Sequence, residues 1–185
     1  KGKNKTVHIM RSGRRILEIR SRQGYDLMQT VGDGRDMFER WGEPENIMID
    51  DNGVGGGVTD RYLELGYEDK VVPVNAGETA DDEAKYSNKR SELAWRVREA
   101  FRLGELDIPD HEELSFECSN QYYDHTSDYK LRVMPKSLLK KLVKRLTGKR
   151  DFDSPDFFDA LCLSYAKEIP SGLSQRKYGS LSEWD

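Results

Sequence analysis

Apolar residues in the first part of the chain change from a strand-like spacing to a helix-like spacing. Short apolar runs at residues 6–10 and 16–19, separated by a polar stretch that contains Gly13, predict the two strands of a β-hairpin. Residues 25–41 carry apolar side chains at helical spacing and predict a helix. We expect an interruption of this helix near residues 32–34, where two glycines lie.

The stretch 47–63 organises the rest of the chain. An apolar run ends at Asp50 and is followed by a glycine cluster and a helical pattern, so we expect a strand, a tight turn and a helix. Residues 71–74 predict a further strand, which Pro73 restricts to a short or edge position. The order hairpin, helix, strand, helix, strand indicates an α/β fold with a mixed sheet flanked by helices.

The second half of the chain predicts mainly helices and one further hairpin. The polar, acidic residues 75–85 are expected to form a loop. The elements expected after this loop are an amphipathic helix over 87–103 that ends at Gly104, a weaker helix over 109–118, a hairpin over 121–134, a helix over 135–146, and a last helix from Pro155 to about Lys167 that Ser154 caps.

Composition describes one domain with a heavily charged surface. The chain has 185 residues, 35% of them charged, and a mean hydropathy of −0.83. We expect a domain over residues 1–169 and a C-terminal tail over 170–185, and we interpret the chain, which begins at Lys1, as a piece of a longer protein. Two isolated cysteines and the lack of a long apolar run favour a reduced, cytosolic protein without a membrane partner.

Asp50 stands where ligands and catalytic groups collect in α/β sheets, at the carboxyl end of a buried strand. The glycines that follow, at residues 53 and 55–57, could also suggest a phosphate-binding loop. However, they match neither the GxxxxGK[ST] pattern nor the GxGxxG spacing. We therefore interpret these glycines as the turn between the strand and the helix.

Asp156 and Asp159 lie on one face of the first turn of the last helix. The residues around them are apolar on nearly all sides, which predicts a buried helix. A buried carboxylate pair is costly unless it is compensated, and it therefore favours a bound cation. The alternative is that Asp156 interacts with the helix dipole and that Asp159 pairs with a nearby arginine.

Together, Asp50, Asp156 and Asp159 form the ligand pattern of a hydrolase that cleaves phosphodiester bonds with two metal ions. Hard oxygen ligands without a Cys or His cluster favour Mg²⁺ or Mn²⁺ over zinc. In such a site one ion activates the attacking water and the other stabilises the leaving 3′ oxygen.

Residues 49–61, IDDNGVGGGVTDR, resemble a segment of the nuclease domain of phage large terminase subunits. Further landmarks of that family occur in the same order, at residues 86–92, 104–109, 131–136 and 154–161. The resemblance implies a ribonuclease-H-like fold, with an inserted helical segment and an extra β-hairpin. It also implies a metal-dependent endonuclease that cuts concatemeric viral DNA at the start and end of packaging.

The resemblance implies roles for single residues and for partners. Asp50 corresponds to the metal ligand on the central strand, and Asp156 with Asp159 supplies the C-terminal carboxylate, with Asp159 slightly favoured. The first catalytic aspartate of the family would lie upstream of Lys1, so we expect weak metal binding and slow or no cleavage from this chain. The implied partners are double-stranded DNA, the packaging ATPase domain of the same subunit, the portal and the small terminase subunit, all in the cytoplasm of the host.

A basic helix is the candidate DNA-binding element. The chain has a net charge of −4, so DNA binding needs a local basic surface. Residues 136–150 contain seven Lys or Arg and no acid, and the candidates for phosphate contact are Lys136, Lys140, Lys141, Lys144 and Arg145. The alternative is that these cations form the solvated face of an amphipathic helix. The hairpin over 121–134 is either a guide for DNA or a plain edge hairpin.

Two other functions are compatible with these residues. A nuclease similar to Holliday-junction resolvases would have the same fold and would cut branched DNA. A non-catalytic module that binds DNA or docks on the packaging motor is favoured by the expected absence of the first acid.

Overall fold

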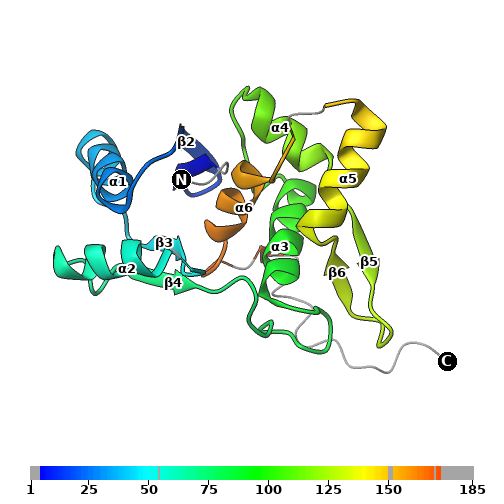
Figure 1. The fold of residues 1–185 in the computed structure, drawn as a ribbon. Helices are drawn as coiled ribbons and strands as arrows, with labels where there is room; N and C mark the ends of the chain where they lie inside the picture. The colour runs from blue at the N-terminus through cyan, green and yellow to red at the C-terminus, as the bar shows by residue number, and fades with distance from the viewer. Residues whose placement is uncertain (1–4, 54, 150–151, 169, 172–185) are drawn as a thin grey trace.

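The computed structural model describes residues 5–53, 55–149, 152–168 and 170–171 (Figure 1). The elements in these ranges are, in chain order, β1 (Lys5–Ser12), β2 (Arg15–Gln23), α1 (Leu27–Trp41), β3 (Ile47–Asp50), α2 (Gly55–Glu64), β4 (Val71–Val74), α3 (Lys89–Leu103), α4 (Glu112–Ser119), β5 (Tyr123–His125), β6 (Leu131–Val133), α5 (Lys136–Thr147) and α6 (Asp156–Leu163). The predicted order of elements is confirmed. The segment before β1, Arg150 and the expected tail beyond residue 171 lie outside the described residues.

The described strands form three separate pairs. β1 and β2 pair antiparallel as predicted, with a register shift between Met10 and Arg11. β3 and β4 pair in parallel, with Asp50 opposite Val74, because α2 connects them as a crossover. β5 and β6 form the second antiparallel hairpin. Within the described residues, the expected mixed sheet is therefore divided into a hairpin and a parallel pair.

Helix α6 lies at the centre of the molecule, between the β1–β2 hairpin and the helices α3 and α4 (Figure 1). It packs against β1, β3, α3 and α4, so apolar side chains are required on most of its surface. The main core gathers around it and includes Leu93, Val97, Ala100, Leu114, Val133, Phe157, Phe158, Leu161 and Cys162. The prediction of a buried last helix is confirmed.

Both ends of α6 differ from the prediction. The helix ends at Leu163 rather than near Lys167, and Ser164 follows it as C-cap. At the other end the N-cap is Pro155, which makes no capping hydrogen bond through its side chain. The expected cap, Ser154, has a buried hydroxyl without a hydrogen-bond partner in the described part of the chain.

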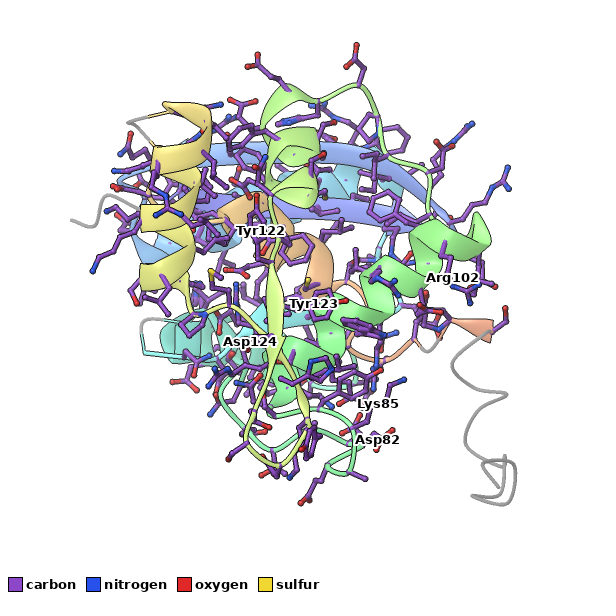
Figure 2. The ribbon with its side chains drawn as sticks, turned by 90° about the vertical axis from the view of Figure 1, so that its right-hand side faces the viewer. Asp82, Lys85, Arg102, Tyr122, Tyr123 and Asp124 are labelled. Atoms are coloured by element: carbon purple, nitrogen blue, oxygen red, sulfur yellow. The ribbon has the colours of Figure 1, made fainter. Side chains whose placement is uncertain are left out.

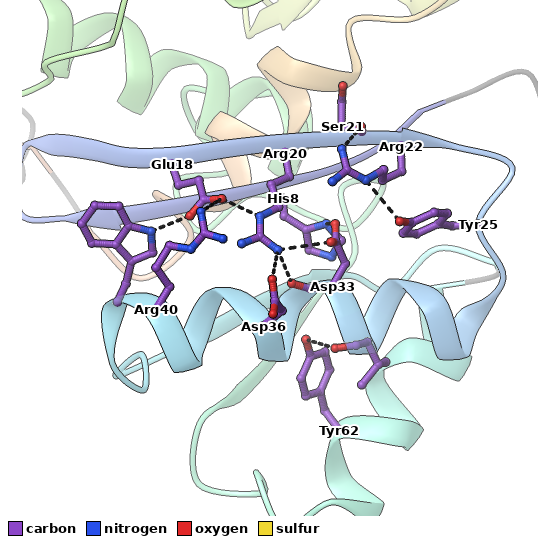
Figure 3. Close-up of polar contacts among 12 residues, drawn as sticks. His8, Glu18, Arg20, Ser21, Arg22, Tyr25, Asp33, Asp36, Arg40 and Tyr62 are labelled. Carbon is purple, nitrogen blue, oxygen red and sulfur yellow. Dashed lines mark hydrogen bonds and ion pairs between the residues drawn. The ribbon is translucent and has the colours of Figure 1, made fainter.

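Helix α1 packs on the β1–β2 hairpin through buried charges (Figure 3). Arg20 of β2 is 8% exposed, and its Nη1 lies 2.6 Å from Asp36 Oδ2 and 3.2 Å from Asp33 Oδ1. Arg20 Nε donates to Glu18 on the same strand at 2.5 Å. His8 of β1 lies beside Asp33, and burial lowers the pKa of His8. The hairpin and α1 are therefore joined by ion pairs in which Arg20 is buried, Asp33 is largely buried and Asp36 is exposed.

The predicted interruption of α1 near residues 32–34 is wrong. The helix is continuous, and Gly34 serves the packing of α1 against α2. A Cβ at position 34 would lie 2.2 Å from the Tyr62 hydroxyl oxygen, which donates to the Val31 carbonyl oxygen. At Gly32 a Cβ would meet open space among the described residues.

Helix α3 is more buried than its amphipathic pattern predicted. Arg96 is 2% exposed, and its Nη2 lies 2.8 Å from Asp81 Oδ2 and 2.9 Å from Glu92 Oε1. Its Nη1 donates to the carbonyl oxygens of Tyr165 and Ala166 at 3.1 and 2.8 Å. This arginine can lie in the interior because acids and carbonyl groups surround it. Arg96 also holds the segment that follows α6.

The β5–β6 hairpin lies across α3 (Figure 2). Tyr123 meets Trp95 of α3 edge-on, with 5.0 Å between the ring centroids. Ser91 Oγ of α3 accepts a hydrogen bond from the backbone N–H of Val133 at 3.1 Å. The hairpin is therefore anchored to α3 by both of its strands.

None of the described helices has the length and apolar character that a membrane span requires.

The substitution Gly34→Ala should destabilise the protein by about 1–3 kcal/mol, because the new methyl group displaces the Tyr62 side chain. Gly32→Ala in the same helix is the matched control and should stabilise by about 0.5–1 kcal/mol, because alanine favours the helix. Chemical denaturation measures both effects. If Gly34→Ala were as well tolerated as Gly32→Ala, the close approach of α1 and α2 would be contradicted.

Candidate metal and DNA site

Asp50 ends β3 at the carboxyl edge of the β3–β4 pair. Its side chain is exposed, and its Oδ1 accepts hydrogen bonds from the Asn52 backbone N–H at 3.3 Å and from Asn52 Nδ2 at 2.7 Å. At Gly55, where α2 begins, a Cβ would lie 1.6 Å from the Asp50 carbonyl oxygen. Only glycine allows α2 to start this close to the strand. The predicted strand, tight turn and helix are confirmed.

Groups from three other elements hold the two acids in the first turn of α6. Asp156 Oδ2 accepts the backbone N–H of Lys5, the first residue of β1, at 2.8 Å. Asp159 Oδ1 lies 3.4 Å from Arg90 Nε on α3, and Asp159 Oδ2 lies 2.6 Å from Lys136 Nζ on α5. The pairing of Asp159 with an arginine, which was the alternative to a bound cation, is present together with a lysine.

Helix α6 runs parallel to β1 and opposite to β3. Just beyond its last turn, Ser164 Oγ accepts a hydrogen bond from Arg11 Nε, near the end of β1, at 3.2 Å. Lys167 Nζ lies 2.7 Å from Asn46 Oδ1, and Asn46 precedes β3. Because the end of α6 lies at the start of β3, its first turn faces the edge at which Asp50 stands.

The three predicted acids do not form a finished coordination sphere. Within the ranges that the structure describes, no three His, Cys, Asp or Glu side chains lie close enough together to hold a metal ion. Asp50 is instead engaged by Asn52, and Asp159 by Lys136 and Arg90. Each of the three acids therefore has a local partner within the protein.

Glu117 of α4 is a fourth carboxylate at the first turn of α6. The residue is 6% exposed, and Glu117 Oε2 accepts the backbone N–H of Phe158 at 2.8 Å. Burial raises the pKa of Glu117 to about 8, and the charges of Asp156 and Asp159 add to this effect, whereas the hydrogen bond from Phe158 opposes it. At neutral pH Glu117 is therefore mostly the neutral acid, and its carboxyl group serves this turn as a hydrogen-bond acceptor.

The sequence pattern missed Glu117, because its signal is weak. It is an acid between Phe116 and Cys118 in a short helix that also contains Glu112 and Glu113. Local spacing does not distinguish it from these two acids, and only the packing of α4 on α6 brings it to Phe158.

The five basic residues that were predicted to contact DNA fall into groups with different partners. Lys136 pairs with Asp159 and belongs to the candidate site. Lys140 and Lys144 lie close to Asp153, whereas Lys141 and Arg145 are exposed. On the opposite face of α5, leucine and valine side chains at positions 139 and 143 are fully buried. The helix is therefore amphipathic, and its cationic face begins at the candidate site.

Glu117 should make the free energy of unfolding of the metal-free protein depend on pH. Its pKa in the folded state, about 8, lies above the ordinary value of 4.5. The contribution of Glu117 to the free energy of unfolding is therefore fully present below pH 4.5 and is lost as the pH rises toward 8. Between pH 5 and 8 the wild type should lose on the order of 2–4 kcal/mol more than Glu117→Gln. Chemical denaturation in a chelator measures the two slopes, and equal slopes would contradict the prediction.

Comparisons with known proteins give structural neighbours of this fold. A comparison with protein-family models and one with curated proteins found no match. Among solved structures, the nuclease domain of the large terminase subunit gp2 of bacterial virus Sf6 is similar over 88% of this chain and 83% of that chain, with 18% identity and a TM-score of 0.69. The large terminase nuclease from thermophilic phage G20c, with bound cobalt, is similar over 88% and 80% of the two chains, with 12% identity and a TM-score of 0.60.

A third neighbour is the large terminase nuclease domain of Thermus phage P74-26, with 11% identity, a TM-score of 0.57 and coverage of 87% of this chain and 77% of that chain. Other structures of the Sf6 domain contain manganese or calcium, and one of the G20c domain contains magnesium. At these identities the likeness establishes the fold, and the expected ribonuclease-H-like α/β class is confirmed. The chain therefore has the fold of the nuclease domain of phage large terminase subunits.

Proposed function

We propose that this chain is the metal-dependent DNA endonuclease domain of a viral genome-packaging terminase. The observation that supports the proposal is that the end of α6 contacts the start of β3, which directs its first turn toward Asp50, in a fold common to metal-bound terminase nuclease domains. The proposed substrate is concatemeric double-stranded DNA, and the proposed cofactors are Mg²⁺ or Mn²⁺ in a two-metal site.

The residues at this edge fit divalent ions. Carboxylate oxygens are the ligands that Mg²⁺ and Mn²⁺ prefer, and the proposed ligands Asp50, Asp156 and Asp159 supply them. Two cationic side chains, Lys136 and Arg90, compensate Asp159 in the structure. A divalent ion would compensate the same charge.

Asp50, Asp156 and Asp159 would hold the ions, which would supply an activated water and stabilise the leaving 3′ oxygen. The chain itself orients these ligands. Asn52 fixes Asp50 Oδ1, and the Lys5 backbone fixes Asp156 Oδ2. Carboxylates held in this way need little rearrangement when an ion binds.

The cationic face of α5 would bind the DNA backbone next to the acids. Lys136 begins α5 at Asp159, and when ions compensate this carboxylate the ammonium group would be free to contact a phosphate. Lys140, Lys141, Lys144 and Arg145 continue the cationic face along the helix and would bind successive phosphates. The acids and the phosphate contacts would thus lie on one continuous surface.

We also propose that an extended segment preceding β1 completes the sheet between β1 and β3. Among the described strands, β1 pairs with β2 only and β3 with β4 only. A cavity of about 430 Å³ lies along residues 7–12 and the first residues of β3, and α6 packs on both strands. A strand in this cavity would bring the first carboxylate that the terminase resemblance implies toward Asp50. Metal binding and cleavage by residues 1–185 would be weak without it.

The proposed partners follow from the proposed role. They are double-stranded DNA, the packaging ATPase domain of the same subunit, the portal and the small terminase subunit, in the cytoplasm of the host. One observation favours a different function, a non-catalytic module that binds DNA or docks on the motor: no three acids among the described residues form a metal site.

In the chain extended upstream of residue 1, nicking of supercoiled plasmid with Mn²⁺ should fall by at least about 100-fold in Asp50→Asn and in Asp159→Asn, because each change removes a proposed metal ligand. Asp60→Asn, at an exposed position of α2, is the matched control and should nick like the wild type. A chain extended upstream of residue 1 should nick faster than residues 1–185. Equal activity of the three variants would contradict the proposed ligands, and an extended chain that does not nick would favour the docking module.

Duplex DNA binding should depend less on salt when the exposed cations of α5 are removed. Lys141→Gln combined with Arg145→Gln should lower the slope of log K against log salt by about 1.8, since each phosphate contact contributes about 0.9. The control pair, Arg35→Gln with Arg40→Gln, makes the same charge change on α1, at the other end of the molecule (Figure 1). Fluorescence anisotropy at several salt concentrations gives both slopes, and equal slopes for the two pairs would exclude α5 as the DNA surface.

A further inference from the structure

The first turn of α6 lacks a capping residue of its own. Its N-cap is Pro155, whose side chain accepts no hydrogen bond, and the Ser154 hydroxyl is buried without a partner in the described part of the chain. The amide N–H groups at the start of a helix have no acceptor within the helix. Because Phe157 and Phe158 are 1% and 5% exposed, water cannot replace a capping group here.

Glu117 supplies this cap from another helix. An N-cap side chain normally accepts the N–H of the second or third helical residue, and Phe158 is the third residue of α6. Glu117 Oε2 accepts this N–H at 2.8 Å, and the bond is buried. The last turn of α4 thereby takes the place of the N-cap residue of α6.

The capped residue lies between the two acids of the candidate site. Phe158 precedes Asp159 directly and follows Asp156 by two positions, so the three residues belong to one helical turn. Any displacement of the Phe158 backbone therefore moves both carboxylates relative to Asp50. The side chains of Phe157 and Phe158 are packed in the core, and the bond to Glu117 holds the backbone of the same turn.

We propose that Glu117 is a positioning residue of the candidate metal site, which holds the first turn of α6 so that Asp156 and Asp159 reach the same ion as Asp50. This inference rests on the proposed nuclease function. Glu117 acts through its hydrogen bond to the Phe158 backbone and does not itself contact the ion or the DNA.

Two conservative variants separate the hydrogen bond from the carboxyl group. Glu117→Gln keeps the length of the side chain and an oxygen acceptor but cannot ionise. Glu117→Asp keeps the carboxyl group but is one methylene shorter and does not reach the Phe158 N–H. Ser154→Ala is the matched control, since it changes a buried hydroxyl that precedes the same helix and has no partner in the described chain.

The experiment uses the chain extended upstream of residue 1, because residues 1–185 are expected to bind metal weakly. It measures Mn²⁺ affinity by electron paramagnetic resonance and the amide hydrogen exchange of Phe158 in the metal-free protein. We expect Glu117→Gln and Ser154→Ala to bind Mn²⁺ within about threefold of the wild type and to keep the Phe158 amide protected. We expect Glu117→Asp to bind Mn²⁺ about tenfold more weakly and to lose protection at Phe158.

Each other result overturns the inference in a recognisable way. If Glu117→Gln binds weakly and Glu117→Asp binds well, Glu117 is a ligand rather than a positioning residue. If Glu117→Asp loses amide protection but binds Mn²⁺ like the wild type, the cap is structural only. If the wild type does not bind Mn²⁺ while the Phe158 amide is protected, the proposed function fails and this inference fails with it.

Discussion

Burial of α6 is the constraint on which the rest of the structure depends. A helix inside the protein must find partners for its first amides and for its acids within the protein itself. Lys5 of β1, Arg90 of α3, Glu117 of α4 and Lys136 of α5 supply these partners at the first turn. Four elements that are distant in the sequence are therefore joined at one place. The groups that compensate the buried first turn of α6 are therefore the same groups that surround the candidate site.

The opposite end of α6 is also held by contacts with other elements. Arg11 binds Ser164, and Arg96 donates to the carbonyl oxygens that follow the helix. Lys167 reaches Asn46 at the start of β3. With both ends attached, the position of the acids is set by α6 as a rigid body against β1 and β3, and sites on rigid elements keep their geometry better than sites on loops.

Most elements of the fold could be predicted from the sequence, because their signals are local. The run that ends at Asp50 and the glycines behind it are examples, since strand, turn and helix are each specified by neighbouring residues. Gly34 was misinterpreted as a helix interruption. Glycine is needed there because the Tyr62 side chain of another helix, α2, lies against it. Ser154 was expected to cap α6 because it lies in the right place, but Glu117 does so from α4. Long-range partners of this kind leave no periodic pattern in the sequence. The assignment of Asp50, Asp156 and Asp159 as metal ligands stays a prediction.

The central claim is that one divalent-ion site forms between the carboxyl end of β3 and the first turn of α6. The most direct measurement is the anomalous diffraction of a crystal soaked in Mn²⁺. Our account predicts a peak within coordination distance of Asp50 and of Asp156 or Asp159, with Lys136 turned away from Asp159. A crystal that binds Mn²⁺ elsewhere, or one in which these carboxylates keep their protein partners at saturating Mn²⁺, would contradict it.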